Sequence, residues 1–355
     1  MISINNHLST KHKDVTIFLE KIVEDMWKDL NPNNKLGKPT KRALTEKVEA
    51  LWRMVSSNKY REEFGSEITK RHLNFTDYLR ETGNLENIIK SQPEGLKKII
   101  KEAQKKLIDS DLFLYKGSKV ESQPFGLLLL KLFNYESYRA SDHCYKRYQE
   151  LGFTEATCPY CNENTVRIIE VNKPGKKEKV MMLYDIDHFY PKHMFPYLAL
   201  SFYNHIPSCK TCNQTFKGSI PFDIDSHIHP YHQCFDSIYQ FKVNHSVLSN
   251  NTVSSVNLVN NTSFPDKLVN ILQLESRYQN SINIARIPKL IDILSKRTHL
   301  LRNNAIPTIE REMLMEELSY FGLIYKKEDI LSNLHSKFHR DIVKFFDVHN
   351  TLNLM

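Results

Sequence analysis

Four cysteines arranged as two Cys-x-x-Cys pairs constrain this chain more than any other feature. The pairs are Cys158 with Cys161 and Cys209 with Cys212, and 47 residues separate them. Two such pairs can complete a tetrahedral thiolate site, in which zinc is structural because no coordination position stays open. The alternatives are four unrelated buried cysteines or a thioredoxin-like redox pair, and no βαβ pattern supports the redox pair. The sequence therefore predicts a structural zinc site that closes a long loop.

The rest of the composition is that of a folded protein that works inside the cell. Of the 355 residues, 41% are hydrophobic and 25% are charged, close to globular averages. The N-terminus lacks the pattern of a signal peptide, and the longest apolar run, "PFGLLLLKLF", is too short to cross a membrane. We therefore expect a cytoplasmic protein without a membrane partner. The net charge of +8 is compatible with a polyanionic partner.

Hydrophobic periodicity predicts an α+β fold that is mostly helical. Residues 1–155 read as a helical N-terminal domain, including one helix over roughly 126–151. Residues 156–235 form a small mixed module, in which "VRIIEV" and "VMMLYDIDHF" are strand-like and "SCKTCNQTFKG" is a short helix ending at Gly218. Residues 236–355 should contain a second hairpin near 237–259, followed by helices.

The segment between the cysteine pairs carries the candidate chemistry. Asp187 and His188 end an apolar, strand-like run, Asn204 precedes the second pair, and Asn213 follows it. Carboxylate and amide oxygens suit a hard divalent cation such as Mg²⁺ or Mn²⁺. A histidine that titrates near neutrality suits general-base activation of water. The four residues are therefore a candidate active site held by the zinc site.

The string "DIDHFYP … NHIPSCKTCN … K" resembles the HNH, or His-Me finger, endonuclease motif in its zinc-knuckled form. The resemblance covers about residues 157–219 and implies a ββα-metal core. It implies that His188 is the general base and that Asp187 and Asn213 bind the catalytic divalent cation. It also implies that Asn204 orients the His188 ring and its loop.

Several residues near this motif have roles that the motif does not fix. Lys217 is a candidate substrate-binding residue that could touch a phosphate oxygen. The alternative is that it is a solvated lysine near a helix end. Asp185 faces the same side of the strand as Asp187 and is a candidate supporting group. His193 and His205 are assigned no chemistry. A second metal site, or an ordinary loop, is possible in "HIHPYHQC" at His227, His229, His232 and Cys234. The lysines of "NKPGKKEK" could clamp a nucleic-acid backbone or belong to a solvated turn.

The expected function is metal-dependent endonuclease activity on nucleic acid, with DNA as the leading substrate. The segment after the module loosely resembles HNH proteins of Septu-type and retron-associated antiphage systems. That resemblance implies bacterial antiviral defence with a partner ATPase. The alternatives are an RNA- or tRNA-directed nuclease and a catalytically inactive, zinc-containing nucleic-acid-binding or scaffold protein.

Overall fold

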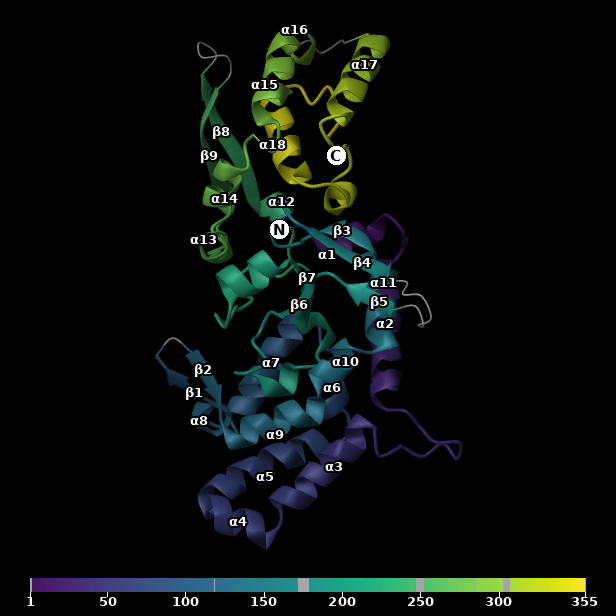
Figure 1. The fold of residues 1–355 in the computed structure, drawn as a ribbon, viewed down its shortest axis with the longest axis vertical. Coiled ribbons are helices and arrows are strands. Elements are labelled where there is room, and N and C mark those ends of the chain that lie inside the picture. Colours follow the sequence, from purple (N-terminus) through teal and green to yellow (C-terminus); the bar gives the residue numbers. More distant parts are fainter. Residues whose placement is uncertain are drawn as a thin grey trace.

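The computed structural model describes residues 2–117, 119–171, 179–246, 252–283, 285–302 and 307–354. Mixed α and β structure is confirmed: helices dominate and the strands form small antiparallel sheets. Most of the N-terminal helices lie at one end of an elongated molecule and the last C-terminal helices at the other, with the sheets of residues 155–208 between them, and the N-terminus lies near the middle (Figure 1). No helix among the described residues is long and apolar enough to cross a membrane.

The N-terminal region is helical, as predicted, with one exception. Its first helices are α1 (Ile4–Ser9), α2 (Val15–Leu30), α3 (Leu44–Val55), α4 (Asn58–Phe64), α5 (Ser66–Arg80), α6 (Asn84–Lys90) and α7 (Pro93–Gln104). Asp14 starts α2 by accepting a hydrogen bond from the Ile17 amide, a standard N-cap. The exception follows α8 (Asp109–Leu112), where β1 (Phe113–Lys116) pairs with β2 (Lys119–Ser122) in a hairpin that periodicity did not reveal.

The single helix predicted over roughly 126–151 is wrong. The chain forms α9 (Pro124–Phe133), α10 (Tyr135–Arg139) and α11 (Asp142–Glu150) instead. Asn134 adopts the left-handed conformation with φ 45°, which asparagine tolerates better than most residues. Ser141 then caps α11 by accepting from the Cys144 amide. These two interruptions turn α10 toward the loop between the cysteine pairs.

The predicted strand 180–189 is two strands in two different sheets. β3 (Glu155–Thr157), β4 (Thr165–Val171) and β5 (Lys179–Met182) form one antiparallel sheet, and β6 (Asp185–His188) pairs separately with β7 (His205–Ser208). The break falls at Tyr184, whose carbonyl oxygen accepts a hydrogen bond from Arg139 Nη2 rather than from a strand. Residues 172–178, with the predicted lysine clamp, lie outside the described residues, as does the Lys179 side chain.

Short helices follow the strands of the central module. They are η1 (Pro196–Leu198), η2 (Phe202–Asn204) and the π-helix η3 (Thr211–Lys217). The helix predicted to end at Gly218 is confirmed at that residue, which has φ 51°. The Gly218 amide bonds to the Asn213 carbonyl five residues earlier, so the turn is wider than that of an α-helix.

The C-terminal region contains the predicted hairpin and helices. They are α12 (Phe235–Ile238), β8 (Tyr239–Ser246), β9 (Thr252–Asn260), α13 (Leu268–Ile271), α14 (Leu274–Asn280), α15 (Ile287–Lys296), α16 (Thr298–Leu301), α17 (Thr308–Ser319), η5 (Lys327–Ser332) and α18 (Ser336–Phe346). Both chain ends reach the central module. The amides of Ile2 and Ile4 bond to the carbonyls of Pro159 and Pro230, and the Leu331 carbonyl accepts from Thr157.

Candidate active site and metal centre

The four cysteines of the two pairs meet in the fold. Their sulfur atoms all lie within 4.8 Å of one another, and every one of the four residues is buried. The Cys161 and Cys209 sulfurs are 3.9 Å apart. Zn–S bonds of about 2.3 Å in a tetrahedron place sulfurs roughly 3.8 Å apart. The cluster therefore fits a tetrahedral metal ion such as zinc, as the spacing predicted. All six cysteines are free thiols without disulfides.

Hydrogen-bond donors surround these sulfur atoms. The Cys209 amide lies 3.3 Å from Cys158 Sγ, and the Cys212 amide lies 3.4 Å from Cys209 Sγ. Arg277 Nη1 donates to Cys212 Sγ at 3.3 Å and brings a positive charge to the cluster. Such donors stabilise thiolates rather than thiols and orient them toward a metal. Burial raises the pKa of Cys158 and Cys212, and these donors act against that shift, toward the charge state in which cysteine binds zinc.

Asn162 anchors the first cysteine pair to the C-terminal region. It is buried and left-handed, with φ 53°. Its amide nitrogen donates to Thr157 Oγ1 and to the carbonyls of Ile330 and Asn333. Its oxygen accepts from Ser336 Oγ and the Lys337 amide. One side chain therefore joins the metal centre to η5 and the start of α18.

We expect Asn162→Gly to lower the free energy of unfolding by about 2–4 kcal/mol, since buried partners lose their hydrogen bonds. Glycine keeps the positive φ, so the change isolates the side-chain bonds. Asn350→Gly is the matched control, because Asn350 has φ 51° but is exposed. Urea denaturation of the three proteins measures the difference. Equal losses in both variants would contradict the anchoring role.

Asp187 and His188 lie at the end of β6, beside β7. In the strand register Asp187 faces Ile206 and His188 faces His205. Both candidate site residues are buried, with 2% and 7% of their surface exposed. The antiparallel pairing with the strand that leads into the second cysteine pair fixes their position relative to the metal centre.

The Asp187 carboxylate is held by two donors. Tyr160, between the first two cysteines, donates its hydroxyl to Oδ2 at 2.7 Å. Lys217 Nζ lies 2.7 Å from Oδ1 and 2.6 Å from the His188 carbonyl oxygen. Lys217 is 1% exposed, so the solvated alternative for this lysine is wrong. Burial lowers the pKa of Lys217, and the adjacent carboxylate opposes that shift. Each carboxylate oxygen keeps one further lone pair.

His188 is fixed in one tautomer. Its Nε2 lies 3.1 Å from the Ala199 carbonyl oxygen, which can only accept, so Nε2 carries the proton. Nδ1 is then the basic nitrogen of the neutral ring. Burial holds the pKa of His188 well below its usual value, and the neighbouring His205 and Lys192 lower it further. The ring is therefore neutral at pH 7 and able to take up a proton.

His205 supports this arrangement, although the sequence assigned it no chemistry. Its Nε2 lies 2.9 Å from the same Ala199 oxygen, and its ring meets the His188 ring edge-on at 4.9 Å between centroids. Burial lowers the pKa of His205 to about 4, so it stays neutral at pH 7. It packs behind the candidate base without adding a charge.

The Asn204 side chain forms its hydrogen bonds with backbone groups of the loop between Tyr190 and Leu198. Its Oδ1 accepts from the Tyr190 amide at 2.7 Å, and its Nδ2 donates to the carbonyls of Tyr190 and Leu198. These bonds lie within the loop, as predicted, and none joins the Asn204 side chain to His188, so the predicted orienting of the ring would act through the loop. The effect is indirect, because Leu198 precedes Ala199, whose oxygen positions both histidines.

Asn213 reaches the site from the first turns of η3. Its Nδ2 donates to Asp185 Oδ2 at 3.0 Å, and Gln214 donates to the same oxygen at 2.7 Å. Asp185 thus orients Asn213, a supporting role that its place on the strand predicted. With its nitrogen committed, the amide presents its oxygen elsewhere. That oxygen and the Asp187 carboxylate suit a hard divalent cation completed by water.

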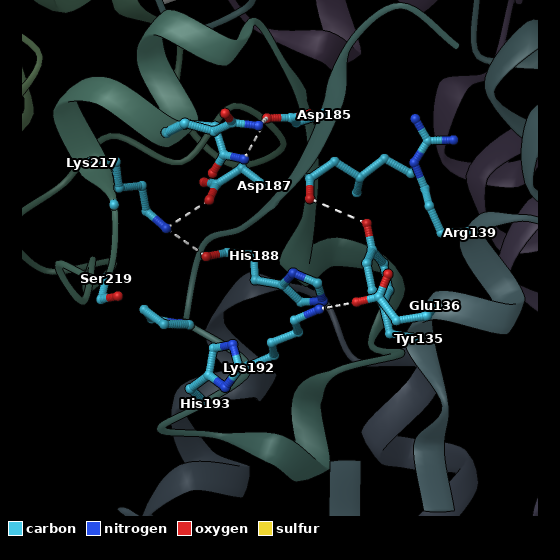
Figure 2. Close-up of a pocket in the computed structure, with 15 residues that line it drawn as sticks. Tyr135, Glu136, Arg139, Asp185, Asp187, His188, Lys192, His193, Lys217 and Ser219 are labelled. Atoms are coloured by element: carbon cyan, nitrogen blue, oxygen red, sulfur yellow. Dashed lines mark hydrogen bonds and ion pairs between the residues drawn. The ribbon is translucent and has the colours of Figure 1, made fainter. Parts of the chain in front are cut away.

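One pocket of about 390 Å³ brings these residues together. Figure 2 shows Asp187, His188 and Lys217 facing it with Arg139 and Lys192. Its lining comprises Tyr135, Glu136, Arg139, Asp185, Ile186, Asp187, His188, Pro191, Lys192, His193, Asn213, Gln214, Lys217, Gly218 and Ser219. The contribution of α10 was missed, because it depends on the two helix breaks. Asn204 does not line the pocket.

The pocket cations differ in their partners. Lys192 pairs with Glu136 and lies over the Tyr135 ring. Among the residues that the structure describes, the Arg139 guanidinium contacts only neutral acceptors, Met182 Sδ and the Tyr184 carbonyl oxygen. An arginine with no carboxylate partner among the described residues, in the same pocket as Asp187 and His188, is available to an anionic ligand.

The alternative second metal site finds no support among the described residues, where the cysteine cluster is the only group of its kind. His229 is buried against Phe189, and burial lowers its pKa to about 3. His232 pairs with Glu94 instead.

Comparisons with protein-family models, curated proteins and solved structures found no match to this chain.

Proposed function

We propose that the protein is a metal-dependent endonuclease that hydrolyses phosphodiester bonds of nucleic acid, with DNA as the leading substrate. The observation that carries the proposal is the fixed tautomer of His188. Its neutral ring has Nδ1 as the basic nitrogen and lies beside Asp187 in a pocket with three cations. A base, an oxygen-ligand pair and phosphate-binding charges are the parts that phosphodiester hydrolysis requires.

Each residue has a distinct role in this proposal. His188 Nδ1 takes a proton from the attacking water, and the Ala199 carbonyl oxygen stabilises the resulting imidazolium through Nε2. Asp187 and Asn213 would hold Mg²⁺ or Mn²⁺, which supplies Lewis-acid stabilisation of the phosphate and its leaving oxygen. Lys217 orients Asp187 and adds positive charge near the scissile phosphate. The Cys₄ cluster would hold zinc as a structural ion.

Arg139 is the proposed phosphate-binding group from the N-terminal helices. We expect Arg139→Met to lower kcat/KM by about 10- to 100-fold, since a hydrogen bond to a charged group contributes about 1.5–3 kcal/mol. Arg139→Lys should recover part of this loss through its charge. Arg167→Met is the matched control, because Arg167 is exposed on β4 and outside the pocket. Steady-state cleavage kinetics would contradict this role if Arg139→Met and Arg167→Met were equally active.

A substrate panel tests the function itself. Zinc-loaded protein is incubated with plasmid, linear duplex DNA, single-stranded DNA and RNA, each with Mg²⁺, with Mn²⁺ or with EDTA. We expect cleavage of at least one DNA substrate that depends on the divalent cation. The His188→Ala variant serves as the control and should not cleave. Cleavage of RNA alone would favour the RNA-directed alternative. No cleavage by folded protein, with nucleic acid still retarded in a gel, would favour the inactive binding protein.

The looser resemblance extends the proposal to antiphage defence with a partner ATPase. A plaque assay on bacteria that express the chain together with a candidate partner ATPase tests this step. We expect fewer plaques with the wild-type pair than with the His188→Ala pair. Equal plaque numbers would contradict a nuclease role in defence.

A further inference from the structure

A second pocket, of about 620 Å³, lies on the other side of α10 from the candidate active site. It is lined by Asp29, Leu30, Pro32, Lys41, Arg42, Leu44, Lys47, Phe133, Asn134, Ser137, Tyr138, Ser141, His143 and Leu200. Helix α10 contributes Ser137 and Tyr138 here and Tyr135, Glu136 and Arg139 to the first pocket. The two pockets share no lining residue, so a ligand in one leaves the other open.

The second pocket carries uncompensated positive charge. Among the described residues, no carboxylate lies within ion-pair distance of Lys41, Arg42 or Lys47. The one acid in the lining, Asp29, is already neutralised by Arg147 Nη2 at 2.7 Å and faces His143 Nδ1 at 3.0 Å. An anion that enters this pocket therefore meets three free cations and no free carboxylate.

Lys47 is the most informative of the three. It lies one turn into α3 and is half-buried, and its ammonium group has no hydrogen-bond partner among the described residues. Burial lowers the pKa of Lys47, and no acid counteracts the shift. A partly desolvated ammonium group without a partner is costly for the folded protein alone. An anionic ligand would remove that cost.

The remaining lining suits the organic part of a ligand. Its apolar side chains are Leu30, Pro32, Leu44, Phe133, Tyr138 and Leu200, and the polar groups beside them are Asn134, Ser137 and Ser141. The volume is within the roughly 300–1,000 Å³ of small-molecule sites, which combine apolar walls with a few polar groups.

We propose that this pocket binds a nucleotide, with its phosphate groups on Lys41, Arg42 and Lys47 and its base against the apolar wall. The proposal goes beyond nuclease activity and does not depend on it. The second pocket is also close to His188, the candidate general base of the first site. Tyr138 stacks on His205, and Leu200 follows Ala199, whose carbonyl oxygen contacts His188.

Isothermal titration calorimetry tests this proposal on the full-length, zinc-loaded protein without added Mg²⁺. The probes are ATP, adenosine and inorganic tripolyphosphate, together with a single-stranded oligonucleotide. We expect ATP to bind more tightly than adenosine and than tripolyphosphate. Lys47→Met and Arg42→Met should each weaken ATP binding at least tenfold. Lys98→Met, an exposed lysine on α7, and Asp187→Asn, in the other pocket, should leave it unchanged.

Several results would overturn the proposal. The proposed nucleotide site would be contradicted if ATP did not bind at millimolar concentration. It would also be contradicted if Lys47→Met and Lys98→Met bound ATP with equal affinity. Loss of binding in Asp187→Asn would assign the nucleotide to the first pocket. Equal affinity for ATP and tripolyphosphate would show that the nucleobase contributes nothing to binding. Binding of the oligonucleotide alone would make this pocket part of a nucleic-acid-binding surface. Lys41→Met, at an exposed position, keeps the test valid if Lys47→Met fails to fold.

Discussion

Replacing His188 with alanine is expected to abolish cleavage, with kcat falling about 10²- to 10⁴-fold, the usual contribution of a general base. The Ala199 carbonyl oxygen fixes the proton on Nε2, so the neutral ring offers Nδ1 to water. Without the ring, the other histidine among the described lining residues is His193, whose Nδ1 lies 3.2 Å from Ser122 Oγ. Single-turnover cleavage with excess enzyme measures this step apart from product release.

His193→Ala is the matched control for this prediction. His193 lines the same pocket, but its Nδ1 lies 3.2 Å from Ser122 Oγ and it is outside the β6–β7 pair. We expect less than a threefold change in this variant. Added imidazole should partly restore His188→Ala, because it supplies a base to the vacated space. Full activity of His188→Ala, or equal losses in both variants, would contradict the proposed role.

Loss of the Cys₄ metal is expected to have the largest effect on stability. We expect Cys212→Ser to lower the free energy of unfolding by more than about 4 kcal/mol, because one ligand is removed and the remaining thiolates repel one another. The effect should spread beyond the site. Tyr278 bonds to the Cys161 carbonyl oxygen at 2.5 Å, and Asn162 joins the same turn to η5 and α18. Thermal unfolding and metal content per chain measure both consequences.

Cys234→Ser is the control, since Cys234 is a free, partly exposed thiol outside the cluster. It should keep its metal and melt within a few degrees of the wild type. A strong chelator should destabilise the wild type and leave Cys212→Ser unchanged. Wild-type protein that contains no zinc, or that melts identically after chelation, would contradict the structural metal centre.

The sequence predicted those parts of the site that depend on local spacing. Two Cys-x-x-Cys pairs suffice to predict the metal cluster, because each pair directs both sulfurs to one point. The order of Asp187, His188 and Asn213 around the second pair likewise predicted that they belong to one candidate site, and all three line one pocket. The role of Asn204 was only partly predictable, because its hydrogen bonds depend on how the loop from Tyr190 to Leu198 folds.

By itself, then, the sequence determined the four-cysteine cluster and the mixed helical architecture, and it singled out His188 as the candidate base, because short-range periodicity and ligand spacing are local properties of a chain. Only the tertiary structure decided which charged side chains lie next to one another in the pocket. The wide turn of η3 directs Lys217 inward to Asp187, and the break at Asn134 turns α10 so that Arg139 reaches a site 48 residues further along. Such contacts follow from packing between distant segments, and no residue pattern encodes them in advance.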